Sequence, residues 1–225
     1  MSPMPFRMCV AADTVAVRCA HDGRLQVLLV VRGNEPFEGR WALPGGFVEE
    51  HEDLPDAAAR ELAEETGLRP VVMDQVGAWG TPGRDPRGRV VSIVYVAVAR
   101  PGADTVRGAD DAARAAWHPV ENLPLLAFDH DQILPAALEH LRRRCETTCM
   151  AFAFLEESFT MDELSRALAA LGAAQPRSAA ARLVAEAGLA AGVGPECRFS
   201  LARMAYLAPL RTPVWVFPAT HEGGE

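Results

Sequence analysis

The sequence predicts an α/β protein in which a strand-rich domain precedes a smaller, mainly helical one. Three observations support this fold class. Apolar, β-branched runs alternate with Gly- and Pro-rich turns in the first part of the chain, an acidic helix interrupts these runs, and alanine-rich helical segments follow residue 148. This change from strand-like runs to alanine-rich helical segments defines the expected domains as residues 1–148 and 149–225.

Strands and helices of the first domain follow from hydrophobic runs and turn residues. Asp22-Gly23 joins the first two strands as a hairpin. The run at residues 89–99 is apolar enough to be buried on both faces. An amphipathic helix is expected at residues 129–147. The expected strands are, in chain order, residues 10–18, 25–31, 71–80, 89–99 and 115–120.

The second domain begins with a capping box at residues 160–163, which opens a helix that runs to about residue 171. A second helix is expected at residues 178–187. Two β-like runs, residues 198–207 and 214–217, follow and are expected to pair as a hairpin. Helix, helix, hairpin is the order of a winged helix, a relative of helix-turn-helix modules.

Composition describes an ordinary soluble protein that is expected in the cytoplasm without a membrane partner. The chain has 225 residues, of which 49% are hydrophobic and 23% charged. No apolar run approaches membrane-spanning length, and Asp13 interrupts the one candidate for a signal-peptide core. The five cysteines are scattered and odd in number, which favours reduced thiols. Cys145, Cys149 and His140 lack the fourth ligand that zinc requires.

Charge indicates how an anionic ligand would be handled. The net charge is −8, and all 22 basic residues are arginine. An acidic protein that binds nucleotides usually does so through metal ions and a few local arginines.

Residues 46–68 carry the most informative pattern of the chain. Asp53 is a good N-cap, Pro55 lies in the first turn, and Gly67 is placed to end a helix. The pattern reads Gly46, five residues, Glu52, seven residues, then Arg60-Glu61-Leu62-Ala63-Glu64-Glu65-Thr66-Gly67-Leu68.

Three carboxylates of this helix are expected on one face. Glu61, Glu64 and Glu65 stand at i, i+3 and i+4, and such a cluster of hard oxygen donors suits Mg²⁺ or Mn²⁺. Arg60 is expected to pair with Glu52 and brace the preceding loop. The alternative is an acidic, solvated helix face. The stripe expected to pack on the sheet is Ala59, Leu62, Ala63 and Thr66, and Gly45-Gly46 lets backbone approach the metal.

The pattern matches the full Nudix signature, so the chain resembles the Nudix hydrolases. The resemblance implies an αβα sandwich with a mixed sheet, which the order of strands and helices fits. It also implies metal-dependent hydrolysis of a nucleoside diphosphate linked to another moiety. Under this reading the metal ligands are Gly45 (through its carbonyl), Glu61, Glu64 and Glu65, and the catalytic residues are Glu64, Glu65, Arg60 and Glu52.

Segments outside the signature resemble a particular Nudix subgroup. These segments are PGRDPRGRVVSIVY (82–95), LPLLAFDHDQIL (123–134) and SFTMDEL (158–164). The subgroup contains ADP-ribose pyrophosphatases and regulators of NAD metabolism, in which the Nudix domain senses ADP-ribose and a C-terminal winged helix binds DNA. The resemblance implies a homodimer and, as first choice of reaction, hydrolysis of ADP-ribose to AMP and ribose 5-phosphate. The alternative is an ADP-ribose-sensing transcriptional regulator.

Two observations favour the enzyme over the regulator. The metal-binding signature is intact, whereas it is often degraded in the regulators. Residues 149–225 contain six Arg against eight Asp and Glu, and the helix expected to face DNA offers only Arg177 and Arg182. DNA as a partner is therefore not favoured, and we expect the second domain to mediate dimer or domain contacts.

Further candidates lie in loops. Arg84, Asp85 and Arg87 are the expected substrate-binding residues, gripping phosphate or the terminal ribose, with a solvated turn as the equal alternative. Asp110 or Asp111 is a candidate general base or additional metal ligand. Trp41 and Phe37 could stack a nucleobase, although a Trp beside the sheet is more often part of the core. Asp129 and His130 are expected to cap or flank the last helix of the first domain.

Overall fold

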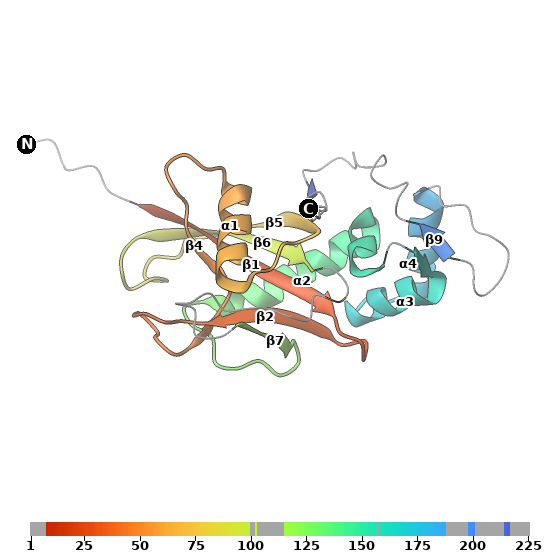
Figure 1. Ribbon diagram of the computed structural model, residues 1–225, viewed down its shortest axis with the longest axis horizontal. Helices are drawn as coiled ribbons and strands as arrows, with labels where there is room; N and C mark the ends of the chain where they lie inside the picture. The colour runs from red at the N-terminus through yellow and green to blue at the C-terminus, as the bar shows by residue number, and fades with distance from the viewer. Residues whose placement is uncertain are drawn as a thin grey trace, which may run out of the picture.

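A mixed β-sheet forms the centre of the computed structural model, which describes residues 8–99, 102, 115–156, 158–187, 198–200 and 214–216 (Figure 1). The sheet order is β10-β5-β6-β1-β2-β3, with β4 also paired to β1 and β7 to β2. β1 and β6 are parallel and the other pairs antiparallel. The strands are β1 (Cys9–Cys19), β2 (Leu25–Val31), β3 (Trp41–Ala42), β4 (Gly45–Phe47), β5 (Val72–Trp79), β6 (Val90–Val98), β7 (Ala115–Pro119) and β10 (Val214–Val216).

Helices α1 (Leu54–Thr66) and α2 (His130–Thr147) cover opposite faces of this sheet. Alternate residues of β1 belong to different apolar clusters: Ala16 packs in the cluster that contains Leu62 of α1, and Val15 in the one that contains Leu141 of α2. Side chains alternate between the faces of a strand, so one strand contributes to both layers. The predicted αβα sandwich with a mixed sheet is confirmed.

β1 changes its neighbouring strand from β4 to β2 along its length, and the sheet divides at this point. Its first part pairs with β4 at residues 11–13, and its last part pairs with β2 at residues 17–19. Asp13 is the last residue of β1 to pair with β4, opposite Gly45. A charged side chain therefore lies at the point where β1 leaves β4.

The C-terminal part continues the apolar core of α2. The 3₁₀ helix η1 (Cys149–Phe154) leads through β8 (Ser158–Thr160) to α3 (Met161–Ala170) and α4 (Pro176–Glu186). The predicted capping box is present, because Thr160 accepts from the Glu163 amide and Glu163 accepts from the Thr160 amide. α4 begins two residues before the predicted start because Pro176 is tolerated in a first helical turn.

The predicted C-terminal hairpin is wrong in the part of the chain that the structure describes. β9 (Arg198–Ser200) pairs with β8, and β10 pairs with β5. Strand β5 would otherwise be a sheet edge with unpaired backbone groups, and an added strand satisfies them. The remaining residues of both predicted runs lie outside the described part of the chain. The likeness to a winged helix therefore rests on the order of α3, α4 and β9.

Two smaller expectations concern helices and thiols. None of the helices in the described ranges combines the length and apolar character that a membrane span requires. Within the described residues, Cys9, Cys19 and Cys145 form no disulfide, and Cys145 is buried whereas Cys9 is exposed.

Candidate active site

Helix α1 is held where the sequence predicts, with one difference in its rotation. Asp53 accepts a hydrogen bond from the Leu54 amide, and Gly67 ends the helix in the left-handed conformation with φ 71°. The buried side chains, however, are Pro55, Ala57, Ala58, Leu62 and Thr66. The predicted stripe is wrong at Ala63, which is only half-buried, whereas Ala59 packs against the same apolar cluster as Leu62.

This rotation places the three signature carboxylates in different environments. Glu65 accepts a hydrogen bond from the Gly45 amide at 3.0 Å, and Glu61 lies against Gly46, where a Cβ would approach its carboxylate to 2.3 Å. The Glu64 side chain is 61% exposed and reaches Arg60 at 3.2 Å. Glu61 and Glu65 are therefore the inner carboxylates, beside the glycine turn, and Glu64 is the outer, exposed one.

Arg60 lies among the acidic side chains and fixes the preceding loop. Its guanidinium donates to both carboxylate oxygens of Glu52, at 2.9 and 2.7 Å, and to Glu61 at 2.9 Å. Glu52 also accepts from the Glu49 amide. The Arg60 hydrogen bonds lower the pKa of Glu52 to about 2. The predicted Arg60–Glu52 brace is present.

The negative charges of Glu61 and Glu65 repel each other, and a bound cation would reduce this repulsion. Burial, opposed by the hydrogen bond from Gly45 and reinforced by Glu61 and Asp13, raises the pKa of Glu65 to about 7. Burial also raises the pKa of Glu61. No group of three His, Cys, Asp or Glu is gathered tightly enough for a metal ion among the described residues. The hard oxygen donors and their mutual repulsion nevertheless fit a divalent cation beside Glu61 and Glu65.

A pocket lies beside these carboxylates, where β1 leaves β4. Gly45 lines it with φ 156°, and a Cβ there would meet the Ala12 carbonyl at 2.4 Å and Asp13 at 2.6 Å. Only glycine fits such an approach. The pocket is lined by Ala11, Asp13, Arg32, Leu43, Gly45, Gly46, Phe47, Arg84, Asp85, Arg87, Val90, Phe128 and His130.

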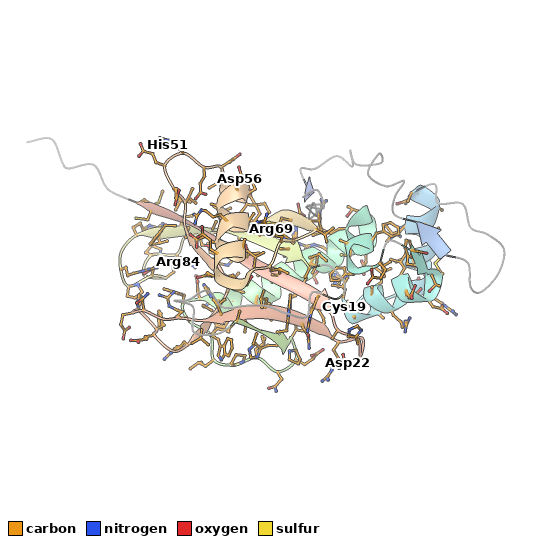
Figure 2. The ribbon with its side chains drawn as sticks, viewed as in Figure 1. Cys19, Asp22, His51, Asp56, Arg69 and Arg84 are labelled. Carbon is orange, nitrogen blue, oxygen red and sulfur yellow. The ribbon has the colours of Figure 1, made fainter. Side chains whose placement is uncertain are left out.

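A buried ion network forms the base of this pocket. The Arg84 side chain is 4% exposed and donates to both oxygens of Asp129, at 2.9 and 2.6 Å, while Asp13 lies 3.8 Å from it. Ser92 donates to Asp13. Figure 2 shows Arg84 at the end of the molecule away from Cys19 and Asp22, which lie at the β1–β2 turn. Arg84 lines the pocket, but its guanidinium is already paired.

Asp129 and His130 lie at the start of α2, as predicted. Asp129 occupies the N-cap position but makes no capping hydrogen bond, because both its oxygens accept from Arg84. His130 is buried and its Nδ1 accepts from the Leu43 amide at 2.9 Å. Burial lowers the pKa of His130. His130 therefore lines the pocket in addition to starting the helix.

The other predicted loop residues divide between pocket and core. Asp85 is buried and holds Arg87 by hydrogen bonds of 2.7 to 3.2 Å, and both line the pocket. Trp41 packs edge-on against His118, at 4.4 Å between ring centroids, which places it in the core as predicted. Asp110 and Asp111 lie outside the described residues.

Asp13, Arg32 and Phe128 are among the pocket residues that the sequence did not predict. The one signal was Asp13, an isolated charge inside an apolar β-run. Arg32 ends an apolar strand, and Phe128 lies in a loop, so neither stands out without the fold.

Comparison with known proteins gives the class to which this fold and site belong. The model of the NUDIX domain family matches residues 11–137, more than half of the chain. The chain therefore belongs to the Nudix family.

Particular relatives refine this assignment. An ADP-ribose pyrophosphatase of Methanocaldococcus jannaschii is 47% identical over 109 residues, 48% of this chain and 63% of that protein. The ADPR-responsive transcriptional repressor NtrR of Acinetobacter baylyi is 35% identical over 154 residues, 67% of this chain and 61% of that protein. The chain thus spans less than two thirds of either relative's length.

A solved structure extends the likeness beyond the Nudix domain. NrtR of Shewanella oneidensis matches with a TM-score of 0.71 and 32% identity, covering 85% of this chain and 92% of that one. That protein has also been solved with a 27mer DNA, and its NUDIX domain with ADP ribose. The likeness places this chain in the ADP-ribose pyrophosphatase-like subgroup that also contains NrtR.

Proposed function

We propose that the protein hydrolyses a nucleoside diphosphate linked to another moiety, with ADP-ribose as the first substrate, giving AMP and ribose 5-phosphate. The observation that carries the proposal is the meeting of Glu61 and Glu65 with the backbone of Gly45 and Gly46 beside an arginine-lined pocket. The 47% identity to an ADP-ribose pyrophosphatase supports the choice of substrate.

Mg²⁺ or Mn²⁺ is the proposed cofactor. Glu61, Glu64, Glu65 and the Gly45 carbonyl would hold it, and when bound it supplies positive charge to the phosphate oxygens and acidifies water. Arg60 contacts Glu61 and Glu64 and is fixed by Glu52, so it orients the carboxylates.

The chain's own carboxylates supply the proton acceptor. Water attacks one phosphorus of the diphosphate, the bridging P–O bond breaks, and the water proton passes to a base. Glu65 is proposed for this role because its carboxylate lies beside Gly45, which lines the pocket. Arg84, Asp85 and Arg87 are the proposed substrate-binding residues on the pocket side.

A coupled phosphate-release assay tests the proposal. The panel is ADP-ribose, NADH, sugar nucleotides and oxidised dNTPs, each with Mg²⁺, with Mn²⁺ and with chelator. We expect metal-dependent turnover of ADP-ribose that falls at least 100-fold in Glu65→Gln and is unchanged in Glu139→Gln, an exposed carboxylate of α2. A folded protein that turns over no member of the panel with metal present would refute the enzyme.

A second candidate function is ADP-ribose-responsive DNA binding, which the repressor relative and the DNA-bound NrtR favour. Local charge opposes it: on α4, Arg177 pairs with Asp162 and Arg182 donates to the Glu146 carbonyl. A mobility-shift experiment with the protein's own promoter region tests it. A specific retarded complex that ADP-ribose weakens would support regulation, and an unshifted probe at low salt would exclude it.

The homodimer also remains a proposal, supported by the subgroup alone. Light scattering after size-exclusion chromatography measures the mass directly against the 24.2 kDa chain. A single peak at the monomer mass across the concentration range would overturn it.

A further inference from the structure

Two guanidinium groups of the pocket are stacked on one aromatic ring. The central carbon of Arg32 lies 4.7 Å from the Phe128 ring centroid, and that of Arg87 lies 5.6 Å from it. Arg87 also lies 5.0 Å from the ring of Phe47. All four residues line the same pocket as Gly45. Stacking on a ring holds a guanidinium in place while its N–H groups stay available for an anion.

Backbone strain supports this aromatic platform. Phe128 and Phe37 both have positive φ, 54° and 66°, a conformation that bulky residues rarely adopt. Their rings meet edge to face at 4.9 Å. Such a conformation is unfavourable and persists only where surrounding structure enforces it, often at ligand-binding sites. The fold therefore holds the Phe128 ring in place at a cost in stability.

Among the described residues, the Arg32 guanidinium donates hydrogen bonds to backbone carbonyls alone. Its Nε donates to the Pro36 carbonyl at 2.7 Å, and one terminal nitrogen contacts the Asn34 carbonyl at 3.3 Å. No carboxylate forms an ion pair with Arg32 within the described residues. Burial, and then the nearby Arg87, lower the pKa of Arg32. Asp85, Glu65 and Asp13 lie near enough to oppose this shift, but none of them is in direct ion-pair contact with Arg32. The half-buried guanidinium therefore keeps hydrogen-bonding capacity for an anion.

Asp85 fixes the second guanidinium. It accepts hydrogen bonds from the Nε and one terminal nitrogen of Arg87, and its own side chain is 3% exposed. Asp85 is therefore a positioning residue that leaves one edge of the Arg87 fork for another acceptor.

We propose that Arg32 and Arg87, held by Phe128 and Asp85, bind the phosphate groups of the substrate as a two-arginine anion site. The inference rests on the proposed function and names the residues that recognise the diphosphate without the metal. A phosphate between the two guanidinium groups would offset their repulsion and accept bidentate hydrogen bonds. Arg32 becomes a substrate-binding residue in addition to the loop residues 84–87.

Calorimetric titration of chelator-treated protein tests the site. The probes are ADP-ribose, inorganic pyrophosphate and adenosine, which separate phosphate recognition from base recognition. In Arg32→Gln we expect at least 10-fold weaker binding of ADP-ribose and of pyrophosphate, with adenosine unchanged. Arg32→Lys keeps the charge without the planar fork and should lose about 3-fold or more. The matched control is Arg18→Gln, which removes a guanidinium stacked at 4.6 Å on Trp117, a residue outside the pocket lining.

Each outcome decides the inference. Equal affinity of wild type and both Arg32 variants for ADP-ribose and pyrophosphate would overturn it, as would wild type binding neither probe. Arg32-dependent pyrophosphate binding by a protein that hydrolyses no ADP-ribose would support the anion site while refuting the proposed reaction. Circular dichroism confirms that each variant is folded.

Discussion

Removal of the buried partner of Arg84 should destabilise the protein strongly. Asp129→Asn replaces a carboxylate that accepts two charge-assisted hydrogen bonds, at 2.9 and 2.6 Å, from a side chain only 4% exposed. Breaking a buried pair leaves an uncompensated charge and costs about 3–5 kcal/mol. Asp13 remains 3.8 Å away and the Asn carbonyl still accepts one bond, so we expect a loss of about 2–3 kcal/mol.

Urea denaturation followed by circular dichroism measures this loss. The control is Asp131→Asn, an exposed residue in the first turn of α2, which should cost less than about 1 kcal/mol. Adding Arg84→Met to Asp129→Asn should recover most of the stability, because it removes the unpaired charge. A change in unfolding free energy no larger than that of the control would refute the assignment of Arg84 and Asp129 as a buried pair.

Three further predictions concern local features. The carboxyl of Glu52 has a pKa of about 2 in the folded protein, against an ordinary value of 4.5. Its contribution to stability is therefore complete above about pH 4.5 and is lost as the pH falls towards 2. Glu52→Gln should flatten the acid unfolding curve between these two pH values. Thr160→Ala removes the capping box that Glu163 completes and should cost about 1 kcal/mol in thermal or urea unfolding, and an unchanged midpoint would contradict it. Burial raises the pKa of the half-buried Cys19 thiol to about 11, so peptide mapping after alkylation at pH 8 should show Cys9 modified first and Cys19 much more slowly until the protein is denatured. Equal labelling of the two cysteines in the native protein would contradict the raised pKa of Cys19.

Local sequence signals predicted the parts of the site that lie on one element. The cap at Asp53, the left-handed end at Gly67 and the Arg60–Glu52 pair depend on residues within one helix and its loop, so spacing alone defines them. The buried face of α1 was predicted only in part, because the three adjacent alanines at residues 57–59 give no strong preference for one face.

Contacts between distant segments could not be predicted. Arg32 and Phe128 meet only after β2 and the start of α2 are assembled, and Asp129 reaches Arg84 across 45 positions of sequence. The pairing of β10 with β5 likewise depends on which sheet edge is open, which hydrophobic patterns do not report. The predicted fold class was right because element order constrains topology more tightly than side-chain partners.

The two sides of the pocket respond differently to substitution. Backbone at Gly45 and Gly46 forms one side, and any larger residue there would collide with Asp13 or Glu61. Arg32, Arg87 and Phe128 form another side from side chains alone. A variant library confined to those three positions would therefore redirect ligand preference while leaving the acidic helix and its glycine turn untouched.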